Sequence, residues 1–355
     1  MRRIVMIASL AALAACGFNG TDPDKDEQQV AAPQAAPTPA DPDLAELQTE
    51  DIPDSEARPQ MQLQVVLDQR GFGPGVIDGK EGLSTANALK GFQEANSLTV
   101  TGKLDEATKM ALGQWSDVAA TRVIRIPASW DEIDYAPVPD EPEDQAKMER
   151  LGYESLDEKL AERFHTTVEV LEQLNPGGRP AGALDEPAAS SSSSGEAAAK
   201  PEGSEPPAAN VFHAGQLVRV PNVGIDAGIA SGEDETWTRT LASLGVGKDQ
   251  PKVIRVVVDK SEGWLKGYDE SDRLVAMFTV TSGSSHDPLP IGDWKVNGVS
   301  KNPPFHYNPD LFWDADATDE KETLPPGPNG PVGVVWIDLS KEHYGIHAVI
   351  LQALE

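Results

Sequence analysis

Cysteine, basic residues and aromatic residues are all scarce in this sequence. A single cysteine among 355 residues excludes an internal disulfide framework, a multi-cysteine zinc site and an iron–sulfur cluster. Lys and Arg number 29 against 58 Asp and Glu, and a net charge of −29 would repel phosphate backbones, which excludes nucleic-acid binding. Hydrophobic residues make up only 39%, whereas 29 prolines and 31 glycines indicate substantial linkers. At roughly 150 residues per domain, the length predicts two or three small domains.

The N-terminus has the pattern of an export signal. Arg2 and Arg3 precede an apolar run over residues 4–15, which is shorter than the roughly 20 residues needed to span a membrane. The run ends Leu13-Ala14-Ala15-Cys16, which resembles the bacterial lipobox and implies a signal peptide over 1–15 and a lipid on Cys16. The alternative is an ordinary signal with an incidental cysteine. Gly17 in place of Asp favours the outer membrane, so we expect a lipid-anchored periplasmic protein of a Gram-negative bacterium.

Three stretches of low complexity divide the rest of the chain. Residues 16–59 lack apolar periodicity and are rich in Pro, Ala, Asp and Gln, which predicts a disordered tether behind the anchor. A second stretch over about 181–210 contains a run of serines, and a third, weaker one covers 224–250. Three blocks with hydrophobic periodicity remain, at 60–113, 150–222 and 252–355.

The block at 60–113 predicts a small all-α bundle of three helices. Leu63, Val66 and Leu67 recur at helical spacing, and a glycine-rich segment at 71–75 ends the first helix. We expect the second helix to start at a Ser84 cap and the third at an Asp105 cap.

This block also resembles the bacterial peptidoglycan-binding domain over its whole length. The matching segments are Leu63-Gln64, Gly71-Phe72, Ile77-Asp78-Gly79, Ala88-Leu89, Phe92-Gln93 and Leu98-Thr99-Val100-Thr101-Gly102. The resemblance implies peptidoglycan binding, but no side chain is chemically unusual enough to predict a ligand site. Core packing is the expected role of most of the apolar residues.

The block at 150–222 predicts two short helices followed by a strand. Capping boxes at 155–158 and 166–169 predict helices that start at Leu156 and Thr167. Asn175-Pro176, Gly215-x-Leu217 and Val220-Pro221 resemble the LysM fold, which implies an α+β module that binds glycan chains containing N-acetylglucosamine. The low-complexity insertion at about 181–210 replaces the usual short connection. His165 and His213 have no companion acid or cysteine at metal spacing, so we expect structural roles for both.

The block at 252–355 predicts consecutive β-hairpins. Strands are expected over 252–259, 264–268 and 273–280, with turns between them. Hairpins in this order predict a β-sandwich or a barrel-like sheet.

The same block strongly resembles the L,D-transpeptidase (YkuD-type) catalytic domain. The motifs that carry the resemblance include Pro290-Ile291-Gly292-Asp293-Trp294, Pro303-Pro304-Phe305, Pro325-Pro326-Gly327 and Tyr344-Gly345-Ile346-His347. In that family a cysteine thiolate attacks an acyl carbon of a peptidoglycan stem peptide and passes the acyl group to an amine on a second stem. A neighbouring histidine lowers the pKa of the thiol. The resemblance implies that His347 is the substrate-site histidine.

The family's nucleophile has no counterpart in this sequence. Ala348 and Val349 stand where the family continues its His-Gly-Thr or His-Gly-Ser motif, and no Ser-His-Gly-Cys follows. Such an abrupt loss of similarity predicts a catalytic domain truncated by a reading-frame shift, with an evolved ending as the alternative. The missing tail would leave an unpaired sheet edge.

Two other sets of residues are poor substitutes for the missing cysteine. Adjacent residues in a loop cannot converge as a catalytic triad, which argues against Ser284-Ser285-His286-Asp287. His343 and His347 lie four residues apart, but Gly345 and the absence of an intervening Glu argue against a helical zinc site.

Two functions remain open. The first is an anchored L,D-transpeptidase that cross-links peptidoglycan or attaches a protein to it, with two wall-binding modules that raise its effective concentration on the polymer. The second is a non-catalytic lipoprotein that tethers the outer membrane to the cell wall. The expected partners are stem peptides, glycan strands and, through the lipid, the membrane, with neither a cofactor nor a metal. The expected fold is multidomain, with an incomplete, mainly β domain at the C-terminus.

Overall fold

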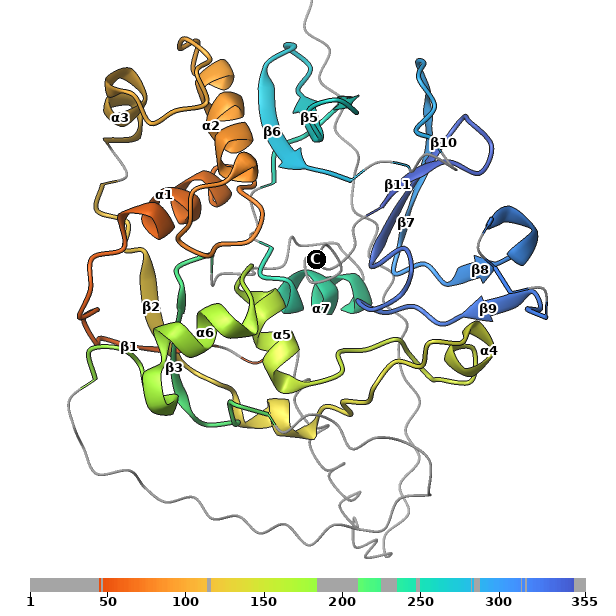
Figure 1. The fold of residues 1–355 in the computed structure, drawn as a ribbon, viewed down its shortest axis with the longest axis horizontal. Helices are drawn as coiled ribbons and strands as arrows, with labels where there is room; N and C mark the ends of the chain where they lie inside the picture. The colour runs from red at the N-terminus through yellow and green to blue at the C-terminus, as the bar shows by residue number, and fades with distance from the viewer. Residues whose placement is uncertain are drawn as a thin grey trace, which may run out of the picture. The chain divides into compact units, whose positions relative to one another are not determined.

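Figure 1 shows the fold in a computed structural model. The structure describes residues 45–347 except 46, 114–115, 184–209, 225–234, 247–249, 282, 284–287, 314 and 317, and these residues belong to one compact unit, Ala40–Glu355. Cys16, the predicted signal peptide, most of the tether and the segment 284–287 lie outside the described residues. Within these ranges, no helix combines the length and the hydropathy of a membrane span.

The first block contains the three predicted helices, α1 (Pro59–Asp68), α2 (Leu83–Ala95) and α3 (Glu106–Leu112). Asp105 caps α3 as predicted, because its carboxylate accepts a hydrogen bond of 2.9 Å from the Thr108 amide. The predicted Ser84 cap is wrong. The N-cap of α2 is Gly82, two residues earlier, since Gly82 is extended and its carbonyl accepts the Ala86 amide at 3.0 Å.

Two buried glutamines in the matched motifs hold the loops of this bundle. Gln64 donates from Nε2 to Asp78 Oδ1 at 2.9 Å and accepts the Gly79 amide on Oε1 at 2.7 Å. Gln93 accepts the Thr101 amide on Oε1 at 2.8 Å and donates from Nε2 to Thr108 Oγ1 at 2.8 Å. Both ends of each amide are therefore satisfied inside the protein, which gives these glutamines a structural role.

The second block forms a βααβ unit that starts earlier than predicted. Its elements are β2 (Thr121–Arg125), α5 (Leu156–Arg163), α6 (Val168–Leu174) and β3 (Leu217–Pro221). Strands β2 and β3 pair antiparallel, so the predicted bounds of 150–222 omitted one strand of the sheet. Short helices η3 (Ala128–Glu132), α4 (Pro142–Gln145) and η4 (Pro176–Gly178) lie in the connections.

The helix caps of this unit are predicted correctly to within one residue. Ser155 caps α5, with its hydroxyl accepting the Glu158 amide at 3.0 Å. Thr167 rather than Thr166 caps α6, because the Thr166 hydroxyl is occupied as a donor to the Ile77 carbonyl at 2.7 Å.

A hydrophobic core joins the βααβ unit to the first block. Leu156 and Leu160 of α5 and Phe164, the residue after it, are buried, and Leu171 and Leu174 face the same core from α6. The members that the first block contributes to this core are Met61, Val65 and Ile77. The two blocks are therefore not independently packed.

The end of the predicted tether is ordered, which differs from the prediction of disorder up to residue 59. Strand β1 (Gln48–Glu50) pairs antiparallel with β2 as a third strand of the sheet. The buried Arg219 guanidinium donates to the carbonyls of Ile52 at 2.8 Å, Pro53 at 3.0 Å and Ala181 at 2.9 Å. Hydrogen bonds to a buried cation therefore order a segment that lacks apolar periodicity.

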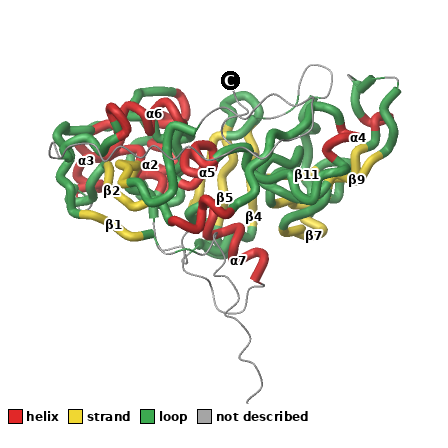
Figure 2. The backbone as a smooth tube through the Cα atoms, turned by 90° about the horizontal axis from the view of Figure 1, so that it is seen from below, coloured by secondary structure: helices red, strands yellow, loops and turns green. Residues whose placement is uncertain are grey.

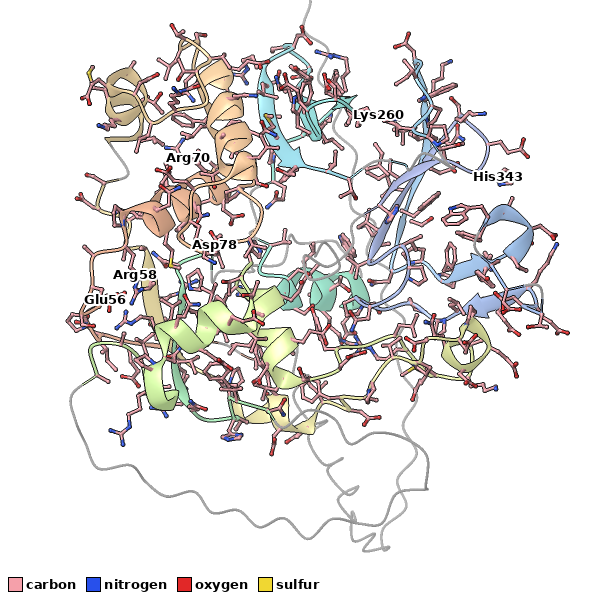
Figure 3. The ribbon with its side chains drawn as sticks, viewed as in Figure 1. Glu56, Arg58, Arg70, Asp78, Lys260 and His343 are labelled. Atoms are coloured by element: carbon pink, nitrogen blue, oxygen red, sulfur yellow. The ribbon has the colours of Figure 1, made fainter. Side chains whose placement is uncertain are left out.

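Asp54 provides a second anchor for this segment. Its carboxylate accepts hydrogen bonds from Arg58 Nε at 2.9 Å and Thr121 Oγ1 at 2.8 Å. Burial raises the pKa of Asp54, but the hydrogen bonds from Arg58 and Thr121 outweigh burial, so its pKa is lowered overall. Figure 3 shows Arg58 beside Glu56 just before α1.

The third block is mainly β, as predicted. The three predicted strands form an antiparallel sheet of β4 (Arg255–Asp259), β5 (Trp264–Tyr268) and β6 (Leu274–Thr279). A second sheet has the order β11-β10-β7, built from β7 (Val296–Lys301), β10 (Val335–Leu339) and β11 (Gly345–His347). Helix α7 (Glu235–Ser243) precedes both sheets in the chain, and η5 (Pro309–Leu311) lies within the second half of the block.

Strand pairing among the described residues contradicts one of the two predicted arrangements, a single barrel-like sheet, and leaves the sandwich as a prediction. Strands β8 (Phe305–Tyr307) and β9 (Glu322–Leu324) form a separate pair, and the two three-stranded sheets share no strand pairing. Figure 2 shows β4 next to β5, and β9 next to α4.

Candidate functional site

His347 lies at the end of the edge strand β11. It is directly opposite Trp336 on β10, and Trp336 is in turn opposite Ser300 on β7. Residues that are paired across antiparallel strands point to the same face of a sheet. Ser300, Trp336 and His347 therefore form one row on a single face.

The rings of Trp336 and His347 stack on each other. Their centroids are 5.9 Å apart and their planes differ by 21°. Gly345 permits this arrangement, because a Cβ atom there would lie 2.4 Å from Cζ2 of Trp336. The glycine in the Tyr344-Gly345-Ile346-His347 motif thus provides the space for the tryptophan that supports the histidine.

Partial burial lowers the pKa of the His347 imidazole, although the residue keeps an exposed edge at the sheet margin. A lowered pKa favours the neutral ring at neutral pH. A neutral imidazole has one nitrogen that donates a hydrogen bond and one that accepts. His347 can therefore orient a polar substrate group or accept a proton.

Ser300 cannot act as a nucleophile with His347 as its base. The two residues sit on the outer strands of this sheet with β10 between them, which separates them by about 9 to 10 Å. A nucleophile and its base need to be within about 3 Å of each other. The row is therefore suited to holding substrate rather than to activating a serine.

Asp338 adds a carboxylate to the same face. It is opposite Gly345 on one side and Gly298 on the other, and a Cβ atom at Gly298 would meet nothing within 4 Å. Asn297 Nδ2 donates to Asp338 Oδ2 at 2.9 Å. The sequence prediction missed Trp336, Ser300 and Asp338, because their shared face depends on strand register.

Comparison with protein families gives two matches. Residues 60–112 match the family model of a peptidoglycan-binding domain, and residues 254–351 match the YkuD model, an L,D-transpeptidase catalytic domain. The chain contains a YkuD domain and a peptidoglycan-binding domain. None of the curated proteins compared with the chain matches it. The resemblances of the first and third blocks are thus confirmed, whereas the resemblance of the second block to LysM stays a prediction. His347 lies inside the YkuD match.

The two histidines His343 and His347 do not form a metal site in the YkuD domain. His343 lies in the turn between β10 and β11, has a φ of 66°, and is labelled in Figure 3. Because β11 is a strand, His343 and His347 are not on one helical face. No group of three His, Cys, Asp or Glu suited to a metal occurs among the described residues.

His165 has a partner that its sequence context did not reveal. Its Nδ1 lies 3.1 Å from Asp68 Oδ2 in the peptidoglycan-binding domain, and its Nε2 lies 3.0 Å from the Leu244 carbonyl after α7. Burial lowers the pKa of His165, but the charge of Asp68 and its hydrogen bond outweigh burial and raise the pKa to about 9. Two acceptors around the ring require both nitrogens to donate, so the ring is an imidazolium that holds Asp68 and the Leu244 carbonyl together. We call this arrangement the His165 clamp. His213 is exposed.

Proposed function

We propose that this protein is by family a peptidoglycan L,D-transpeptidase lipoprotein, of the kind that forms cross-links in the bacterial cell wall through a cysteine acyl-enzyme, and that the 355-residue chain lacks the catalytic cysteine. The observation that carries this proposal is the presence of a YkuD domain in the same chain as a peptidoglycan-binding domain. Joining the two raises the effective concentration of the catalytic domain on its polymer.

The proposed reaction has two acyl-transfer steps. A cysteine thiolate attacks an acyl carbon of one stem peptide, the bond to the leaving amine breaks, and a thioester forms. The amine of a second stem then attacks the thioester, a new amide forms, and the thiolate is released. We propose that His347, supported by the ring of Trp336, holds the stem peptide beside the reacting carbonyl.

The sequence has no cysteine between residues 17 and 355 that could supply this thiolate. We propose that the thiol of Cys16 is consumed as the thioether of a lipid anchor, which places the protein in the periplasm at the outer membrane. On this proposal the 355-residue chain itself forms no cross-links. The alternative function is that of a non-catalytic peptidoglycan-binding lipoprotein that tethers the outer membrane to the cell wall.

We further propose that the βααβ unit is a LysM-like glycan-binding module. Its support is the order of its elements, with β2 and β3 paired and α5 and α6 packed on them. Asn175, from the motif that resembles LysM, holds the end of α6 to the sheet. Its Nδ2 donates to the Arg219 carbonyl at 2.8 Å, and its Oδ1 accepts the Arg219 amide at 2.7 Å.

A cross-linking assay distinguishes the two functions. The 355-residue chain and a version extended by the family's Ser-His-Gly-Cys segment would each be incubated with tetrapeptide muropeptides, and the products separated by chromatography. We expect dimers only from the extended version, and none after its cysteine is acylated by a carbapenem. Dimers from the 355-residue chain that survive thiol alkylation would overturn the mechanism. If neither version makes dimers but both sediment with sacculi, the non-catalytic function is favoured.

A further inference from the structure

We propose that the peptidoglycan-binding domain has a second function, which is to cover the first sheet of the YkuD domain and to fold with it as one cooperative unit. This function is separate from wall binding and does not depend on it. Four kinds of contact between the two domains carry the proposal.

The first is a shared hydrophobic core. Leu67, Phe72 and Phe92 of the peptidoglycan-binding domain belong to the same buried cluster as Leu274 and Met277 of β6. Figure 1 shows α2 running alongside β6. Because Met277 is only 1% exposed, losing this cover would expose apolar surface on both domains.

The second contact continues the sheet into the peptidoglycan-binding domain. The Met277 amide donates to the Gly71 carbonyl at 2.9 Å, and the Gly73 amide donates to the Met277 carbonyl at 2.8 Å. Phe72 thus forms a parallel bridge with Met277 at the free edge of β6. Pairing an edge in this way removes backbone groups that would otherwise require solvent.

The third contact is a rim of polar pairs around the shared core. Lys266 of β5 forms an ion pair with Glu94 of α2, and the Lys266 side chain is only 13% exposed. Lys90 lies 3.3 Å from the Glu262 carboxylate, and Asn87 Nδ2 donates to the Glu262 carbonyl at 3.1 Å. These pairs fix α2 in one register against β5 and its preceding turn.

The fourth contact is a close approach at Gly91, in the interior of α2. A Cβ atom there would lie 2.6 Å from Sδ and 2.9 Å from Cβ of Met277. Glycine in a helix interior costs about 1 kcal/mol relative to alanine. The close approach of Met277 explains why position 91 is glycine despite this cost, since no larger residue fits there without displacing β6.

The test is Gly91→Ala in the full chain, measured by native-state hydrogen exchange at the Met277 and Gly73 amides. On a free helix, alanine would stabilise α2. Because α2 packs against β6, the added methyl group should overpack the contact with Met277 and speed hydrogen exchange at both amides by about tenfold or more. Gly113→Ala is the matched control, because a Cβ atom at Gly113 meets nothing within 4 Å, and it should leave both amides unchanged. Unchanged or slower exchange in Gly91→Ala would overturn the proposal.

A charge reversal across the interface provides a second, independent readout. Glu94→Lys and Lys266→Glu should each speed exchange at Met277, and the double variant should restore most of the protection. Purely additive effects of the two reversals would contradict the proposed contact. Sedimentation with sacculi, measured on the same variants, reports wall binding separately, so failure of the cover function is distinguishable from failure of the proposed function.

Discussion

The clamp at His165 predicts how stability depends on pH. The ring links three segments of the chain. His165 lies between α5 and α6, and its ring contacts Asp68 at the end of α1 and the Leu244 carbonyl after α7. Only the imidazolium form donates to both acceptors. Raising the pH should therefore remove one hydrogen bond and the attraction to Asp68 together.

The sign and size of the effect follow from the raised pKa. His165 has a pKa of about 9 in the folded protein, against 6.5 for an ordinary histidine. The stabilisation is fully present below pH 6.5 and is lost as the pH rises through about 9. At about 1.4 kcal/mol per pKa unit, the upper limit is about 3.5 kcal/mol. Since 26% of the side chain is exposed, we expect about 2 kcal/mol.

Urea unfolding at a series of pH values from 6 to about 10 measures this directly. His165→Asn removes the titrating ring and suits the left-handed backbone at this position, where φ is 53°. The wild type should lose about 2 kcal/mol more than His165→Asn across that range, whereas the control His213→Asn should behave as the wild type. Parallel curves for the wild type and His165→Asn would refute the clamp.

Three further predictions concern other parts of the chain. Gly345→Ala should displace Trp336, shift its fluorescence and cost about 1 to 3 kcal/mol, whereas Gly298→Ala, which meets open space, should do neither; equal effects would contradict the account. Arg219→Met should leave three carbonyls without a donor, cost about 3 kcal/mol or more, and speed proteolysis within residues 48–58; unchanged proteolysis would argue against the anchor. An alkyne fatty acid should label the wild type but not Cys16→Ser, and equal labelling would exclude lipidation at Cys16.

Local signals in the sequence predicted much of the fold. Asp105 and Ser155 cap helices as predicted, since capping depends on residues within one turn. The strands at 255–259, 264–268 and 274–279 follow from β-branched runs and the turns between them. The two family matches confirm the resemblances to a peptidoglycan-binding domain and to the YkuD domain, because the motifs of both families extend over whole domains.

Long-range pairings could not be predicted from spacing along the chain. Asp68 and His165 are distant in sequence, and so are Arg219 and the carbonyls of Ile52 and Pro53. Strand β2 was missed because it pairs with β3 across the helices and the insertion. The stacking of Trp336 on His347 depends on the register of β10 and β11, which the motif alone does not specify.

The most direct test of the proposed acyl-enzyme is an intact-mass measurement after reaction with a carbapenem. The 355-residue chain, with Cys16 as its only cysteine, and the version extended by Ser-His-Gly-Cys would be treated in parallel. We predict one covalent adduct on the extended version, located at its added cysteine and lost when that cysteine is replaced by serine, and none on the 355-residue chain. An adduct on residues 17–355, or none on a folded extended version, would contradict the account.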